Sequence, residues 1–225
     1  MPSISNIAAQ TLQRRILSGD YAPGTALPSQ RELSDALGIS RASLREAISM
    51  LEALGMVRSQ AGKGVFVTAG TRPPPDELPT GPNAMPPAAI FQLRYVVEPA
   101  SASLAAQRAA AADLSALHAC QAGMKAALTA CDLVMAADAD LRFHLAIAAL
   151  SGNPALGAIA EQFKAQLAFS LRLPFADRQH VWQPADEHQA IVDAIVAGDA
   201  AQARRAMQTH LLAASQRVGI AFVQP

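Results

Sequence analysis

The chain has 225 residues, 18 basic and 18 acidic side chains, and a hydrophobic fraction of 51%. This length exceeds what one small domain needs, so we expect two domains with separate cores. Frequent alanine and an aromatic fraction of only 4% favour a mainly α-helical protein. No apolar run is long enough to span a membrane, and residues 1–10 do not resemble a secretory signal, so we expect a cytoplasmic protein with no membrane partner.

The N-terminal part of the sequence predicts two helices. Apolar residues recur at helical spacing over residues 5–18, and Gly19 supplies the stop. Ser29 and Glu32 form a capping-box pattern, which predicts the start of a short second helix. Gly38 ends that helix.

A third helix is predicted after a very short turn. Ser40 is suited to cap its N-terminus, and an apolar stripe runs through residues 44–51. Two short helices joined by a tight glycine turn form a helix-turn-helix, whose second helix enters the major groove of DNA with its N-terminus first. The first turns of that helix carry Arg41, Ser43 and Arg45, so we expect these side chains to approach DNA.

Two strand-like runs, residues 56–58 and 65–67, flank a glycine-rich loop. This pattern predicts a β-hairpin, or wing. Gly62 lets the backbone approach a phosphate or a minor groove closely, and Lys63 adds positive charge at the tip. Residues 1–69 are therefore predicted to form a winged helix-turn-helix domain that binds DNA.

The order of short motifs in this region resembles the DNA-binding domain of the GntR family of transcription regulators. The match runs through this region without a gap and rests on these motifs: Pro23-Gly24, Leu27-Pro28-Ser29, Arg31-Glu32-Leu33, Ser40-Arg41, Leu44-Arg45-Glu46-Ala47, Leu51, Leu54-Gly55 and Gly62-Lys63-Gly64. The resemblance implies that three arginines approach DNA with four supporting residues: Arg31, Arg41 and Arg45, with Ser40, Ser43, Gly62 and Lys63. An isolated arginine is more often a solvated charge, and Arg14, Arg15 and Arg58 keep that interpretation.

Seven of the fifteen prolines fall between residues 72 and 87. Proline fixes φ and removes a backbone donor, so this stretch predicts an extended linker over residues 70–87. Beyond it, the pattern predicts an all-α helical bundle over residues 88–225, with six helical segments: 88–110, 112–129, 132–150, 154–172, 185–197 and 200–220. The length of this domain and its patterns Arg94…Glu98-Pro99 and Asp140…His144 resemble the FadR-like, or FCD, branch of the GntR family.

Four polar residues lie on apolar helical stripes of the predicted bundle. Asp140 and His144 are one turn apart, while His188 and His210 lie on two other stripes, so all four should face inward. A single inward histidine is more often a hydrogen-bonded core residue than a ligand. Three histidines with a carboxylate instead suit a divalent transition metal such as Zn²⁺ or Ni²⁺. The metal-binding FCD subgroup uses the same Asp-x3-His, His, His set.

The resemblance also implies what the bundle senses. A matching arginine binds the effector carboxylate in the FCD branch, which gives Arg94 that role here. We therefore expect a homodimer on a roughly palindromic operator, released from it by a small organic acid that contacts the metal and Arg94. Repression relieved by the effector is the commoner arrangement in the family.

Two other functions fit part of this sequence pattern. A metal-dependent hydrolase also uses three ligands and an open position, with Glu187 beside His188 as its base. Adjacent residues on a helix point about 100° apart, however, so Glu187 should not face the metal when His188 does. A nucleoid-type DNA binder would leave the inward polar set unexplained. We therefore favour a regulator over an enzyme.

Overall fold

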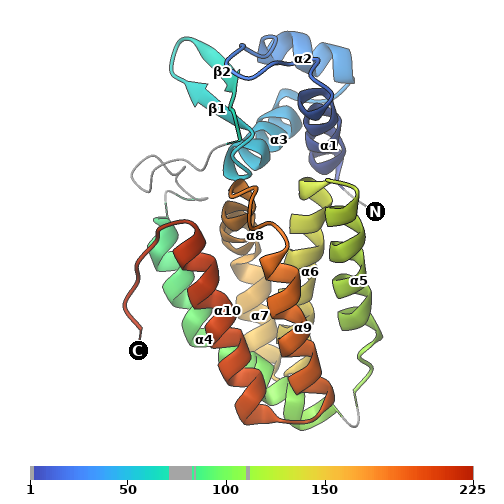
Figure 1. Ribbon diagram of the computed structural model, residues 1–225, viewed down its shortest axis with the longest axis vertical. Helices are drawn as coiled ribbons and strands as arrows, with labels where there is room; N and C mark the ends of the chain where they lie inside the picture. Colours follow the sequence, from blue (N-terminus) through green and yellow to red (C-terminus); the bar gives the residue numbers. More distant parts are fainter. Residues whose placement is uncertain (1–2, 71–82, 84, 110–111, 225) are drawn as a thin grey trace.

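The computed structural model describes residues 3–70, 83, 85–109 and 112–224. Its N-terminal part, called the head below, contains three helices and one hairpin (Figure 1). These elements are α1 (Ile4–Leu17), α2 (Gln30–Leu37), α3 (Arg41–Ala53), β1 (Val57–Gln60) and β2 (Gly64–Val67). The two strands are antiparallel, with Gln60 opposite Gly64 at the turn. The predicted winged helix-turn-helix is confirmed.

The C-terminal part, called the bundle below, is entirely helical in its described residues (Figure 1). Its elements are α4 (Pro87–Arg108), α5 (Ser115–Thr129), α6 (Leu133–Leu150), α7 (Pro154–Gln162), α8 (Lys164–Arg172), the 3₁₀ turn η4 (Leu173–Ala176), α9 (Gln183–Val196) and α10 (Ala200–Arg217). The mainly α fold class is therefore confirmed. No helix within the described ranges is long and apolar enough to cross a membrane.

The helix ends of the head follow from local chemistry. Ser29 accepts a hydrogen bond from the backbone of Glu32, whose side chain bonds back to the Ser29 backbone, so the predicted capping box is present. Gly38 has a φ of 64°, a left-handed conformation that glycine adopts without strain. Ser40 accepts from the backbone N–H of Ser43 and caps α3. These caps fix the turn between α2 and α3.

The prediction of one helix over residues 154–172 is wrong. The structure has two helices there, because Phe163 ends α7 and begins α8 with φ −98° and ψ 15°. Its side chain is half-buried and lines a cavity of the bundle, so packing overrides an apolar pattern that continues through the break. The predicted linker over 70–87 lies largely outside the described residues.

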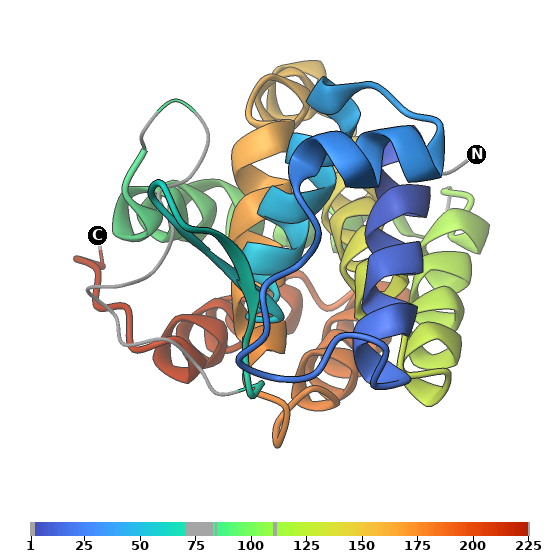
Figure 2. The ribbon, with the colours of Figure 1, turned by 90° about the horizontal axis from the view of Figure 1, so that it is seen from above.

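Residues of the head and the bundle pack together in a large hydrophobic cluster, although the bundle also has clusters made of its own residues. The cluster includes Leu12 and Leu51 of the head together with Met124, Val134 and Phe175 of the bundle. Helix α1 packs against α6, and α3 packs against α8. Figure 1 shows the head at one end of the bundle, with α1 above the end of α6 that it packs against, and Figure 2 shows the same arrangement from above. The N-terminal end of α6 is therefore fixed by the head.

Candidate functional site

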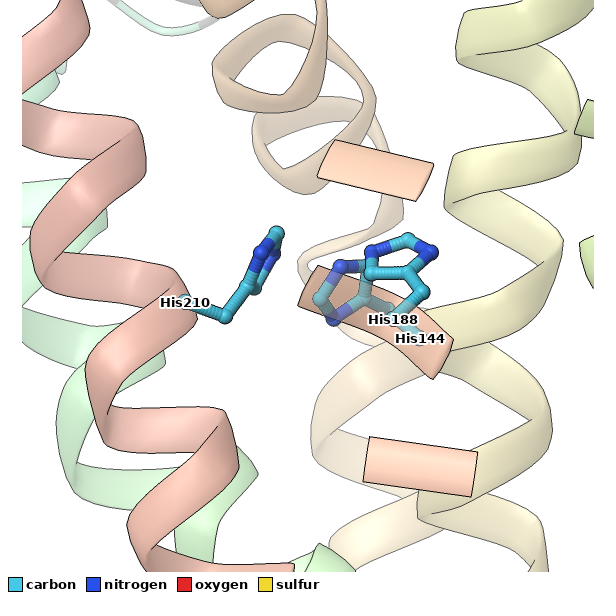
Figure 3. Close-up of side chains that lie close together, drawn as sticks. All are labelled: His144, His188 and His210. Atoms are coloured by element: carbon cyan, nitrogen blue, oxygen red, sulfur yellow. The ribbon is translucent and has the colours of Figure 1, made fainter. Parts of the chain in front are cut away.

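Three histidine side chains meet inside the bundle. His144 lies on α6, His188 on α9 and His210 on α10, and Figure 3 shows the three side chains close together. Each offers a ring nitrogen, and these three atoms lie within 4.8 Å of one another. None of the three residues is more than 4% exposed. Three separate apolar stripes thus converge on one buried point.

Asp140 lies one helical turn before His144. Its Oδ1 is 3.3 Å from Nε2 of His144 and 3.3 Å from Nε2 of His188, and the residue is only 2% exposed. The structure therefore brings all four predicted metal ligands into one place. Asp140 approaches two of the three histidines.

Several atoms of this cluster lack a hydrogen-bond partner. Among the described residues, the buried atoms without one include Oδ1 of Asp140, both ring nitrogens of His188 and Nε2 of His210. A buried polar atom without a partner costs free energy, and such atoms are rare in folded proteins. A divalent ion that accepts nitrogen and oxygen ligands would satisfy them. The donor set present here fits Zn²⁺ or Ni²⁺.

Burial and charge also set the protonation of the three histidines. Burial lowers the pKa of His188 well below its ordinary value. Burial lowers the pKa of His210 as well, although Glu187 opposes it. For His144 burial acts in the same direction, but the carboxylate of Glu98 outweighs it and raises the pKa. His188 and His210 are thus neutral near pH 7, which is the form that binds a metal.

Arg94, the predicted effector-binding residue, lies beside this cluster and is 1% exposed. Its Nε donates to Oε1 of Glu98 at 2.8 Å, and its Nη2 donates to Oε2 at 3.3 Å. Its Nη1 donates to the hydroxyl of Ser170 at 3.3 Å, and its Nη2 lies 3.4 Å from Nε2 of His144. Burial would raise the pKa of Glu98, but Arg94 and His144 hold it well below its usual range. The anion that a buried arginine needs is therefore supplied within the same helix.

A small cavity lies next to Arg94. It has a volume of about 30 Å³, which is enough for roughly one or two water molecules. Arg94 and His144 form its polar end, and Val97, Phe163 and Leu167 contribute to its apolar wall. A larger molecule enters this space only if those apolar side chains move.

The predicted DNA-binding residues lie on the head, apart from this cluster. Six are exposed and Ser43 is half-buried. The exposed six are Arg31, Ser40, Arg41, Arg45, Gly62 and Lys63. Gly62 has a φ of 71°, which favours glycine at the turn of the wing. The arginines and the lysine are therefore accessible to a phosphate backbone.

Residues 4–67 match the bacterial regulatory proteins of the gntR family, and residues 89–213 match the FCD domain. The chain belongs to the GntR family. Its head and bundle correspond to the two matched regions, and regulators of this family bind operator DNA and small-molecule effectors.

Known GntR-family proteins resemble this one over most of their length. A regulatory protein of the L-lactate dehydrogenase operon of Escherichia coli K12 is 34% identical over 222 residues, which cover 92% of this chain and 83% of the relative. The transcriptional regulator LutR of Bacillus subtilis is 30% identical, with 87% and 92% covered. A GntR transcriptional regulator of known structure from Rhodococcus sp. RHA1 has a TM-score of 0.57 at 26% identity, with 98% and 100% covered.

Both matched domains and these relatives are transcription regulators, so this GntR-family chain is a regulator and not an enzyme. The hydrolase alternative receives no support. The structure gives Glu187 a different contact from the one that its position beside His188 suggested. Its Oε2 bonds to Nδ1 of His210 at 2.8 Å, which is a contact across two helices. Periodicity along α9 alone could not reveal it.

Polar contacts between the head and α6 were also missed from the sequence of this GntR-family chain. Gln13 of α1 is 1% exposed. Its Oε1 accepts from the backbone N–H groups of Leu133 and Val134 at 3.0 and 3.3 Å, and its Nε2 donates to Oδ1 of Asp132 at 3.1 Å. The first N–H groups of a helix have no partner within it. A side chain from the head therefore completes the N-terminus of α6.

A second contact lies one turn further along α6. Nδ2 of Asn6 donates to Oδ1 of Asp138 at 3.2 Å. Arg172 of α8 lies in the field of both Asp138 and Glu46 of α3, and burial lowers its pKa to about 10 although these two carboxylates oppose the shift. Head and bundle are thus joined by charge as well as by apolar packing.

Proposed function

We propose that this chain is a ligand-responsive repressor of a catabolic operon, released from DNA by a small organic acid bound beside a divalent transition metal. The observation that supports the metal best is the convergence of buried atoms without partners, Oδ1 of Asp140 and Nε2 of His188 and His210. Together with His144 they offer nitrogen and oxygen ligands that suit Zn²⁺ or Ni²⁺. When bound, the ion would leave positions open for oxygen atoms of the effector.

The chemistry around Arg94 favours an acidic effector. One of its five N–H donors remains after the bonds to Glu98 and Ser170 and the contact with His144 are counted, so a carboxylate can add to it. The relative named for an L-lactate dehydrogenase operon favours a hydroxy acid. Because the cavity has a volume of only about 30 Å³, the effector must displace Phe163 or Leu167 on entry.

The head is proposed to read operator DNA through α3 and the wing. Arg31, Arg41 and Arg45 are exposed cations that can reach base edges or phosphates, and Lys63 extends the charge to the wing. One such head reads too few base pairs to specify an operator, so we expect a homodimer on a palindromic site in the cytoplasm. Light scattering should give a molar mass twice that of one chain, which is 23.5 kDa.

Helix α6 offers a direct route between the two functions. It carries Asp140 and His144 in its middle, and Asp132 and Asp138 where it meets the head. An effector that shifts α6 by a small amount therefore moves the residues that hold α1. The proposed repressor changes the orientation of its heads through this packed contact, in addition to the linker.

A thermal-shift screen tests the proposal. The full chain, purified without an affinity tag, is first analysed for metal and then heated with L-lactate, other hydroxy acids, sugar acids and dicarboxylates, each with and without added Zn²⁺. A ligand of the folded state raises the melting temperature by mass action. Stabilisation by one of these acids that requires the metal would support the proposal. Metal-free protein with no response to any acid would overturn the metal-containing pocket.

A further inference from the structure

Two of the three clustered histidines, His210 and His144, each have a glutamate carboxylate close to Nδ1. Nδ1 of His210 bonds to Oε2 of Glu187 at 2.8 Å, and Nδ1 of His144 lies 2.8 Å from Oε2 of Glu98. Each glutamate in turn pairs with an arginine through both carboxylate oxygens. His188 differs, since neither of its ring nitrogens has a hydrogen-bond partner among the described residues.

The pair behind His210 has the tighter geometry. Nη1 of Arg217 donates to Oε1 of Glu187 at 2.6 Å, and Nη2 donates to Oε2 at 2.9 Å. Nη1 also donates to Oε1 of Gln183 at 3.1 Å. This two-pronged contact holds the carboxylate in one plane, because a guanidinium presents its donors in a fixed fork. Glu187 therefore cannot turn away from His210 without breaking two charged hydrogen bonds.

The hydrogen bond fixes the tautomer of His210. An ionised carboxylate only accepts, so the proton of the neutral imidazole must lie on Nδ1. Nε2 is then left with its lone pair, and this atom is buried without a partner. A metal-binding histidine is oriented in the same way by a carboxylate on its other nitrogen.

We infer that Glu187, held by Arg217, is the positioning residue that presents Nε2 of His210 to a divalent metal ion. The inference rests on the metal site proposed above. The ring of His188 is oriented by a different contact, because it stacks on Phe143 with centroids 3.9 Å apart and planes 8° apart. Glu98 and Arg94 lie in a similar place beside His144, but Nδ1 of His144 has no hydrogen-bond partner among the described residues. Both residues also line the cavity, so variants there would alter effector binding as well.

The simplest alternative is that Glu187 and Arg217 only fasten α9 to α10. That role would change the stability of the metal-free chain and leave its metal affinity unaltered. The two roles are therefore separated by measuring both quantities on the same variants.

The experiment uses the full chain, freed of metal with a chelator, and measures the Zn²⁺ dissociation constant by competition with a chromophoric chelator. Glu187→Ala should weaken Zn²⁺ binding by about 10- to 100-fold, and the visible spectrum of bound Co²⁺ should shift. Glu187→Gln keeps an acceptor oxygen and should show a smaller loss. Asp186→Asn, an exposed neighbour on the same helix, is the matched control and should bind like the unaltered chain.

One measurement needs no variant. Long-range nitrogen–proton spectra of the metal-free chain should show His210 protonated at Nδ1, and protonation at Nε2 instead would overturn the inference. A chain that binds Zn²⁺ equally well with and without Glu187 would also overturn it while leaving the metal site intact. Failure of the unaltered chain to bind Zn²⁺, Co²⁺ or Ni²⁺ would overturn both.

Discussion

The head and the bundle place their polar residues in opposite ways. On the head, Arg41, Arg45 and Lys63 are exposed, so a large charged partner can reach them directly. In the bundle, His188 and His210 are at most 2% exposed, and a partner must come to them through packed side chains. One region presents its polar residues at the surface, and the other encloses them.

Because of this difference in exposure, a different measurement is informative for each region. Exposed charges contribute little to the free energy of unfolding, so substituting them should change DNA affinity and its salt dependence rather than stability. Buried polar atoms without partners destabilise the fold until a ligand satisfies them. Variants of the head should therefore change binding, and ligands of the bundle should change stability.

The largest expected effect is stabilisation of the bundle by metal. A free Zn²⁺ concentration about 100 times its dissociation constant should raise the free energy of unfolding by about 2.7 kcal/mol, and a chelator should reverse this. Urea unfolding with and without Zn²⁺ measures the effect. His188→Ala should abolish the response while operator binding by the head persists in part. An equal response in that variant would separate the stabilisation from the histidine cluster.

Gln13→Ala should weaken the connection between the two regions. The substitution leaves the backbone N–H groups of Leu133 and Val134 without their acceptor, so it should lower the free energy of unfolding by about 2–3 kcal/mol. Gln10→Ala removes one hydrogen bond from a less buried side chain and should cost clearly less. If both variants unfold alike in urea, the contact between α1 and α6 contributes nothing specific.

Arg41→Ala should lower operator affinity by about 2 kcal/mol, or roughly 30-fold, because the side chain stands at the N-terminus of α3 where a guanine edge can be read. Lys63→Ala should weaken all DNA sequences similarly and by a smaller factor. Electrophoretic mobility shifts on operator and unrelated DNA compare the two. Arg14→Ala, an exposed cation of α1, is the control and should bind normally. Unchanged affinity in Arg41→Ala would contradict the assignment of α3.

Acidification should destabilise the metal-free bundle through His188. Burial holds the pKa of this side chain well below its ordinary value, so below about pH 6.5 the unfolded chain binds a proton that the folded chain does not. The free energy of unfolding should then decrease by up to about 1.4 kcal/mol for each unit by which the pH is lowered. His144, whose pKa is raised, contributes in the opposite direction. His188→Gln should reduce the slope measured by urea unfolding, and part of the slope should remain because burial also lowers the pKa of His210.

The head was predictable from sequence because its signals are local. The capping box at Ser29 and Glu32, the glycine at Gly38 and the cap at Ser40 each act within four residues, and all of them are present in the structure. The inward faces of the four cluster residues also followed from helical periodicity, since the period fixes which residues share a face.

What lay beyond prediction depends on contacts between elements. The pairing of Glu187 with His210 joins α9 to α10, and the contact of Gln13 with the start of α6 joins residues 120 positions apart. No spacing along one helix encodes either. Glu98 is different, because its separation of four residues from Arg94 was available in the sequence and could have predicted the ion pair.

The hydrophobic cluster shared by head and bundle limits how this chain can be recombined. A chimaera joined within the proline-rich segment would bring a foreign α1 to the cluster that contains Val134 and Phe175, where Leu12 of α1 belongs in this chain. The new head would need matching shapes at those positions, whatever DNA it reads. Specificity is therefore easier to change at exposed residues near the N-terminus of α3, such as Arg41 and Arg45, than by exchanging the whole head.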